Sequence, residues 1–205
     1  MRVLPYGAAA LLFEADPDEI RAVATALIRR PPRGAVDIVP AERTVLVRVV
    51  PGTDLAGVRA HVLALDRTAA AGSPGPPETV AIPVTYDGAD LERVAELTGL
   101  SAADVVAAHT ASAWTVSFCG FAPGFAYLTG GDPRLAVPRR DSPRARVPAG
   151  SVALAGSYSA VYPGVSPGGW QLIGRTDATV WDLDRDPPAR LRPGVRVTFS
   201  DVGPP

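Results

Sequence analysis

The sequence predicts an α+β protein with two domains, and two observations lead to this fold class. Residues 1–67 alternate between strand-like and helix-like stretches, which is typical of a compact α+β unit. They are followed by RTAAAGSPGPPE, a run of Ala, Gly and Pro that has no apolar period and cannot bury a core. We therefore expect a small N-terminal α+β domain at 1–67, a linker at 68–78 and a second, β-rich domain at 79–205.

The N-terminal domain is expected to contain three strands and two helices. Its first helix has clear start signals, because Asp16 can cap it, Pro17 fits the first turn and Glu19 completes the spacing of a capping box. In the second helix, Val58 and Val62 share one apolar stripe. The expected strands lie at 9–15, 34–41 and 43–50, and the expected helices at 16–30 and 53–66.

The second domain is expected to begin with a strand and two helices and to continue as strands. Ser101 and Asp104 have the spacing of a capping box at the start of the second of these helices. The strand that follows places Trp114, Val116 and Phe118 on one face. Beyond it, frequent Gly and Pro residues predict turns between short strands. The expected strands lie at 79–87 and 113–121, and the expected helices at 88–99 and 101–110.

Residue counts exclude several kinds of chemistry. All 20 basic residues are arginine, so the chain has no lysine for a Walker A motif, a Schiff base or the attachment of biotin. Cys119 is the only cysteine, which rules out an intramolecular disulfide and a cysteine cluster for zinc or iron–sulfur. We expect no metal site.

Charge and hydropathy limit the partners and the compartment. A net charge of −1 argues against general binding to nucleic acid or to an anionic membrane surface. No apolar run reaches the roughly 18 residues that a membrane span needs. Asp16 and Asp18 interrupt the N-terminal apolar patch where a signal-peptide cleavage site would stand. We therefore expect a cytoplasmic protein that binds neither nucleic acid nor membrane.

Residues 120–176 differ from the rest of the chain in composition. They hold half of the 20 glycines, and they carry six arginines against two aspartates, whereas the remainder of the chain is acidic. Arginine binds carboxylate and phosphate groups through two parallel hydrogen bonds, so this segment is a candidate anion site. The alternative is that these arginines lie on solvated loops and form weak surface ion pairs.

The same segment carries several uncommon motifs in a fixed order. These are GFAPGFAYL, DPRL, PRRDSPRARVPAGSV and SPGGWQLIGRT. In this order they resemble the signature region of the KipI / PxpB family, the B subunits of 5-oxoprolinase, which is also the first carboxyltransferase subdomain of allophanate-hydrolase and urea-carboxylase type proteins. The resemblance implies an α+β fold in which a small N-terminal α+β domain is followed by a cyclophilin-like β-barrel domain.

The resemblance also implies a function that is shared between subunits. Together with a KipA/PxpC-type subunit and a LamB/YcsF-type subunit (PxpA), such proteins look like the ATP-dependent 5-oxoprolinase, which opens 5-oxo-L-proline to L-glutamate while hydrolysing ATP. ATP would be shared with or supplied by a partner subunit, and the isolated chain is expected to be inactive. Two alternatives stay open: a KipI-like regulator that inhibits a sensor histidine kinase, and a prolyl isomerase, suggested only by the barrel shape.

Residue types and the resemblance together select the candidate site residues. His109 suits acid–base work at neutral pH, although a structural role at the helix end is equally open. Gly168 and Gly169 form a corner in the motif SPGGWQLIGRT, where the backbone can approach a ligand closely. Gln171 could hydrogen-bond to an amide or a carboxylate, and the arginines could bind an anion. We expect His109 and Arg144 to be catalytic, and Arg139, Arg146, Gln171, Arg175, Gly124, Gly168 and Gly169 to bind substrate or anion.

Overall fold

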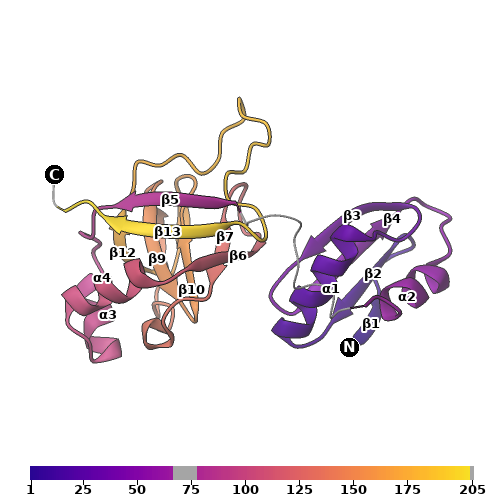
Figure 1. Cartoon of the computed structure of the whole chain (residues 1–205), viewed down its shortest axis with the longest axis horizontal. Helices are drawn as coiled ribbons and strands as arrows, with labels where there is room; N and C mark the ends of the chain where they lie inside the picture. Colours follow the sequence, from indigo (N-terminus) through magenta and orange to yellow (C-terminus); the bar gives the residue numbers. More distant parts are fainter. Residues whose placement is uncertain (67–77, 204–205) are drawn as a thin grey trace. The chain divides into compact units, whose positions relative to one another are not determined.

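The structure is a computed structural model that describes residues 1–66 and 78–203 of the 205 residues (Figure 1). The chain divides into two compact units, Met1–Pro76 and Pro77–Pro205. The predicted linker at 68–78 lies outside the described residues except for its last position.

The first unit is a four-stranded antiparallel sheet with two helices on one of its faces. The strands follow the order β1-β2-β4-β3 across the sheet. One apolar cluster joins the two helices to the buried side of β2 and β4, where Phe13, Val45 and Val47 are fully buried. The elements are β1 (Arg2–Pro5), β2 (Ala10–Glu14), α1 (Pro17–Arg29), β3 (Ala35–Pro40), β4 (Thr44–Val49) and α2 (Leu55–Leu63).

Local sequence explains these elements well. Asp54 caps α2 by accepting from the amides of Ala56 and Gly57, at 3.0 and 3.1 Å. Asp16 is the N-cap residue of α1, with Pro17 in the first turn as the sequence predicts, but the Asp16 side chain makes no capping hydrogen bond. The sequence did not predict β1, a short edge strand that ends in proline.

The second unit is a nearly closed barrel of seven strands. Its strand order is β12-β9-β10-β7-β6-β13-β5, antiparallel except for the parallel pair β13 and β5. A bridge between Thr85 and Arg175 connects the ends of the two edge strands, β5 and β12. The elements are β5 (Thr79–Val84), α3 (Leu91–Thr98), α4 (Ala102–Ala111), β6 (Trp114–Cys119), β7 (Ala126–Thr129), η2 (Pro133–Leu135), β8 (Arg144–Val147), β9 (Ser151–Ala155), β10 (Tyr158–Val161), β11 (Ser166–Gly168), β12 (Gln171–Arg175) and β13 (Arg196–Asp201).

Side chains alternate between two apolar layers of this sheet. One layer fills the barrel with residues such as Trp114, Leu154 and Ile173, and α3 and α4 contribute to it. The other layer contains Trp170 and Leu172 and lies on the opposite face, beneath the two-stranded ribbon of β8 and β11. This alternation along β12 is the one that strand geometry requires. The predicted fold class, a small α+β domain followed by a barrel, is confirmed.

Candidate functional site

A buried carboxylate organises the arginine-rich segment. Asp90, just before α3, is only 3% exposed, and its Oδ1 accepts hydrogen bonds from Arg140 Nη1 at 2.8 Å and Arg144 Nη2 at 2.7 Å. Its Oδ2 accepts from the backbone amide of Leu172 at 2.7 Å. Burial opposes ionisation of Asp90, but the hydrogen bonds from Arg144 and Leu172 and the two guanidinium charges hold its pKa below the usual value. Asp90 is therefore an anion at neutral pH.

The loop before α3 is pressed against β12, and this contact places Asp90. The amide of Asp90 donates to the Leu172 carbonyl at 2.9 Å, and the amide of Gly88 donates to the Ile173 carbonyl at 3.2 Å. A Cβ atom at Gly88 would lie 2.3 Å from the carbonyl carbon of Ile173, so only glycine permits this approach. The Asp90 side chain makes no capping hydrogen bond to α3, which leaves its carboxylate for the arginines.

The arginine loop, residues 138–144, is held by the corner that precedes β12. The amide of Arg140 donates to the Gly169 carbonyl at 2.7 Å. Gln171 Nε2 donates to the Pro138 carbonyl at 3.1 Å, and this contact fixes which end of the amide is the oxygen. The proline- and glycine-rich corner thus serves as a backbone support for the arginine loop.

Glycine is also required at the corner itself. A Cβ atom at Gly168 would lie 2.3 Å from the hydroxyl of Tyr162. At Gly169 it would lie 3.6 Å from Arg139 Nε, so the Arg139 guanidinium passes close to the corner. Burial raises the pKa of Tyr162, and the charges of Arg139 and Arg144 oppose this shift, as expected if both guanidinium groups lie near the phenol.

Several polar atoms of this cluster lack a partner. In the described part of the chain, Arg140 Nε, Arg144 Nη1 and Gln171 Oε1 are buried and make no hydrogen bond. Buried polar groups are normally paired, because leaving one unpaired costs about 1–3 kcal/mol. Two guanidinium groups also share one carboxylate, so the cluster carries an excess positive charge. The cluster therefore keeps two arginine donors and one amide acceptor that no described group uses.

A cavity of about 310 Å³ opens beside these groups. Arg140 and Gln171 both line it, so the excess charge faces solvent-accessible space. Its complete lining is Arg93, Leu97, Pro138, Arg139, Arg140, Asp141, Ser142 and Gln171. The lining thus offers arginine side chains and the Gln171 side chain to an occupant, and arginine is suited to a carboxylate or phosphate.

The structure brings five of the predicted site residues together and leaves the others apart. The five are Arg139, Arg144, Gln171, Gly168 and Gly169. Arg146 is exposed on β8, and Arg175 is exposed and pairs with Asp87 at 2.8 Å. Gly124 has a φ of +78° in the turn before β7, where a Cβ atom would lie 2.5 Å from Trp181 Cβ. The functional roles of all these residues stay predictions.

Sequence reasoning missed two members of the site. Arg140 lies in the same arginine-rich segment as the predicted Arg139 and Arg144. The sequence therefore pointed to this segment, but Arg140 was not selected from it. Asp90 looked like an ordinary residue at a helix start, and nothing local distinguishes it. Its partners lie 50 to 82 residues further along the chain.

His109 lies in the barrel core and is not among the residues that line the cavity beside the arginine loop. It is fully buried, its Nδ1 lies 2.7 Å from the Tyr86 hydroxyl, and its Nε2 lies 2.8 Å from the Ser159 hydroxyl. Burial lowers the pKa of His109 to about 3, so the ring is neutral at pH 7. Both ring nitrogens are occupied, a placement that favours the structural one of the two roles left open by the sequence.

Residues 1–66 and 78–203 contain neither a metal cluster nor a membrane helix. Within these ranges no group of three His, Cys, Asp or Glu side chains could hold a metal ion. No helix in the same ranges is long and apolar enough to cross a membrane.

Comparison with known sequences identifies relatives of the chain. Residues 1–191 match the family model described as carboxyltransferase domain, subdomain C and D. The proteins named as the B subunit of 5-oxoprolinase in Bacillus subtilis (strain 168) and Escherichia coli O157:H7 are 47% and 49% identical over 126 and 123 residues. These alignments cover 60% and 58% of this chain and 52% and 56% of the relatives. The chain thus spans little more than half the length of these relatives.

Solved structures agree with this assignment. TTHA0988 is 36% identical with a TM-score of 0.79, and the match covers 96% of this chain and 40% of that one. The conserved uncharacterized protein PH0987 from Pyrococcus horikoshii is 34% identical with a TM-score of 0.59, over 98% of both chains. The urea carboxylase of Kluyveromyces lactis, at 20% identity and a TM-score of 0.75 over 98% of this chain and 21% of its own, shares the fold. The resemblance inferred from the motifs is confirmed, and the chain belongs to the family of the carboxyltransferase domain, subdomains C and D.

Proposed function

We propose that the chain is a subunit of an ATP-dependent 5-oxoprolinase and that the cluster around Asp90 binds the carboxylate of 5-oxo-L-proline. The names of the curated relatives support the activity. The observation that supports the position of the site is that Arg140 and Arg144 share the carboxylate of Asp90 and each keeps an unpaired nitrogen. Arg140 also lines the cavity. Bidentate arginine contacts suit a carboxylate of this kind.

The reaction explains why such a site is needed. A lactam carbonyl is a poor electrophile, and ATP supplies a phosphoryl group that would activate its oxygen. Ring opening then depends on holding the substrate in one orientation, which fixed positive charge can do from its carboxylate end. In this proposal Arg139 and Arg140, which line the cavity, bind that carboxylate, and the Gln171 oxygen accepts the neighbouring lactam N–H. Arg144 supports them through its hydrogen bond to Asp90.

The residues present do not form a conventional nucleotide site. The chain has no lysine, so it cannot build a Walker A loop, and ATP would be bound by a partner or at a shared surface. The proposed partners are a KipA/PxpC-type subunit and a LamB/YcsF-type subunit (PxpA), working in the cytoplasm where ATP is available. The kinase-inhibitor alternative is not favoured, because the curated relatives carry the name of an enzyme subunit.

Reconstitution tests this proposal. The three subunits are combined, and glutamate release from 5-oxo-L-proline is measured with and without ATP and with and without this chain. We expect release only when the chain and ATP are both present, and none from the isolated chain. Full activity of the two partner subunits without this chain would contradict the proposal.

A further inference from the structure

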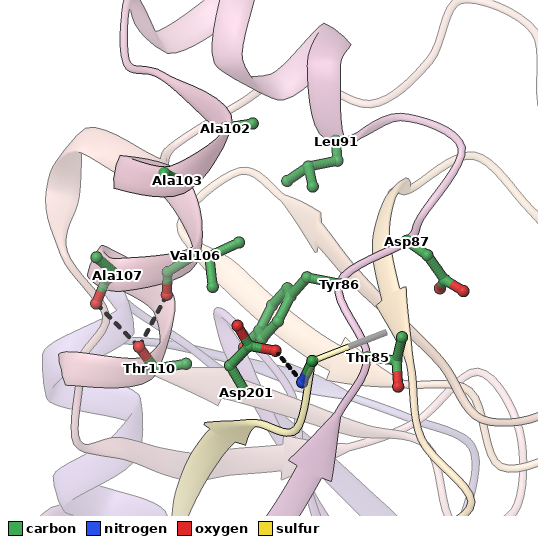
Figure 2. Close-up of a pocket in the computed structure, with 11 residues that line it drawn as sticks. Thr85, Tyr86, Asp87, Leu91, Ala102, Ala103, Val106, Ala107, Thr110 and Asp201 are labelled. Atoms are coloured by element: carbon green, nitrogen blue, oxygen red, sulfur yellow. Dashed lines mark hydrogen bonds between the residues drawn. The ribbon is translucent and has the colours of Figure 1, made fainter. Parts of the chain in front are cut away.

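A second cavity, of about 530 Å³, lies between α4 and the ends of β5 and β13 (Figure 2). It shares no lining residue with the cavity beside the arginine loop. Its lining is Thr85, Tyr86, Asp87, Leu91, Ala102, Ala103, Val106, Ala107, Thr110, Asp201 and Gly203. The volume falls within the range of about 300–1,000 Å³ that is typical of small-molecule sites.

The helical wall of this cavity is apolar. Leu91 and Val106 extend toward the same space near the Tyr86 ring in Figure 2. The three alanines of α4 in the lining add further apolar surface without filling the space. An occupant must therefore bring an aliphatic part to this wall, because a wholly polar molecule would lose its hydration there.

Two polar groups of the cavity, the Thr110 hydroxyl and the Gly203 amide, already donate hydrogen bonds within the protein. The Thr110 hydroxyl donates to the carbonyls of Val106 and Ala107, at 2.9 and 3.2 Å, as the dashed lines of Figure 2 show. The amide of Gly203 donates to Asp201 Oδ1 at 2.9 Å. The remaining carboxylate oxygen of Asp201 is an acceptor, so it is free for an occupant that donates a hydrogen bond.

The Tyr86 hydroxyl is another polar group of the cavity that already has a hydrogen-bond partner. Its hydroxyl lies 2.7 Å from Nδ1 of His109, and Nε2 of His109 lies 2.8 Å from the Ser159 hydroxyl. A neutral imidazole accepts at one nitrogen only, and a phenol is the stronger acid of the two hydroxyls, so we assign Tyr86 as the donor to Nδ1. The hydroxyl proton of Tyr86 is then used in the hydrogen bond to His109. The ring face and an oxygen lone pair of Tyr86 remain available to a ligand.

The charge around the cavity is negative. Burial and the nearby charge of Asp201 raise the pKa of Tyr86, so the field of that carboxylate reaches the cavity. None of the 11 lining residues is basic. The other lining carboxylate, Asp87, is already paired with Arg175.

We propose that this cavity binds a small aliphatic cation, a primary ammonium or guanidinium group on a short alkyl chain. The cationic group donates to Asp201 and lies against the Tyr86 ring, where a cation is also attracted by the ring face. The alkyl chain packs on Leu91 and Val106. This inference is independent of the proposed oxoprolinase activity, because it concerns a different cavity and a ligand of opposite charge.

The test uses the full chain and n-pentylamine as the probe, with n-pentanol and pentanoate as comparisons of the same length. Binding is followed by the amide shifts of a ¹⁵N-labelled sample at pH 7.5. We expect saturable shifts at Thr85, Val106 and Thr110 with a Kd on the order of 1 mM for the amine, at least tenfold weaker binding of pentanol, and none of pentanoate. Binding of all three probes with equal affinity would overturn the proposal.

Two variants separate the carboxylate from general charge effects. Asp201→Asn is nearly isosteric and should weaken the binding of n-pentylamine at least tenfold. Glu92→Gln removes the same charge from an exposed position on α3 outside the cavity and should leave the Kd unchanged. The melting temperature of both variants shows that they are folded. Unchanged amine binding by Asp201→Asn, or an equal loss in Glu92→Gln, would refute the assignment.

Discussion

Arg144 donates a 2.7 Å hydrogen bond to the carboxylate of Asp90, which stands 54 residues earlier in the chain. This contact ties the ribbon of β8 and β11 to the start of α3. Arg140 shares the same carboxylate oxygen. One buried anion therefore both fixes the arginine loop and leaves it with a net positive charge. The first of these roles concerns stability, and the second concerns the binding of an anionic substrate.

Replacing Asp90 by Asn should destabilise the second unit. The variant leaves two partly buried guanidinium groups without a counter-charge, for which we expect a loss of about 2–4 kcal/mol in the free energy of unfolding. Urea denaturation measures it. The matched control is Asp87→Asn, which breaks the exposed pair with Arg175 and should cost about 0–1 kcal/mol. Equal losses in the two variants would show that the buried Asp90 contributes no more to the free energy of unfolding than the exposed Asp87.

Replacing Arg144 or Arg139 by Ala should lower the kcat/KM of the reconstituted complex at least tenfold. That factor corresponds to about 1.4 kcal/mol of lost anion stabilisation. Arg144→Ala should also lower the melting temperature because it removes a contact of Asp90, whereas Arg139 is exposed and its loss should leave stability almost unchanged. Arg146→Ala, on the same strand as Arg144, is the control; because Arg146 is exposed and does not line the cavity, the structure leads us to expect that this variant retains activity. A comparable loss of activity in Arg146→Ala would argue against a localised site.

Replacing Gln171 by Glu should weaken binding of the anionic substrate. The new carboxylate would face Arg140 and the cavity, where it would compete with the substrate for the guanidinium donors. We expect the KM for 5-oxo-L-proline to rise at least tenfold in the complex. Gln171→Leu, which removes the polar group without adding charge, should have the smaller effect. If the charge made no difference between the two variants, the carboxylate would bind elsewhere.

His109 should make the protein less stable in acid. Its pKa is about 3 when folded and about 6.5 when unfolded, so below pH 6.5 the unfolded chain binds a proton that the folded chain does not. The stability contributed by neutral His109 is present at pH 7 and is lost as the pH falls from 6.5 toward 3. Between pH 7.5 and pH 5 we expect a loss of about 2 kcal/mol from this residue.

His109→Gln isolates this effect because it keeps a donor and an acceptor but does not titrate in this range. The free energy of unfolding of both proteins is measured by urea denaturation at pH 7.5 and 5. Other groups titrate equally in the two proteins, so the difference between their pH dependences reports on His109. The same pH dependence in both would mean that His109 is not buried as a neutral ring.

Much of the fold was predictable because its signals are local. The helix expected at 16–30 is observed at Pro17–Arg29, where an acidic start and an apolar stripe coincide. The strand expected at 113–121 is observed at Trp114–Cys119, with strictly alternating burial. The strand β1 was missed because four residues ending in proline carry no period to detect.

The candidate site was less predictable because it depends on contacts distant in sequence. Composition pointed to the arginine loop, and motif order pointed to the glycine corner. Neither could show that Asp90 joins them, since this requires the register between the loop before α3 and β12. Composition also could not tell a buried His109 from an accessible one, because the two occupy the same position on a helix.

The place of β13 in the barrel also constrains the order in which this unit can assemble. The last strand of the unit lies between β6 and β5, and it pairs with β5 from Arg196 opposite Thr79 to Asp201 opposite Val84. During synthesis, β5 is made first and β13 last, so the hydrogen bonds between β5 and β13 can form only when synthesis of the unit is nearly complete. Contacts so distant in sequence are typical of slow folding. The seven-stranded barrel can therefore form only after β13 has left the ribosome. Until then, the edge of β5 that pairs with β13 has no partner.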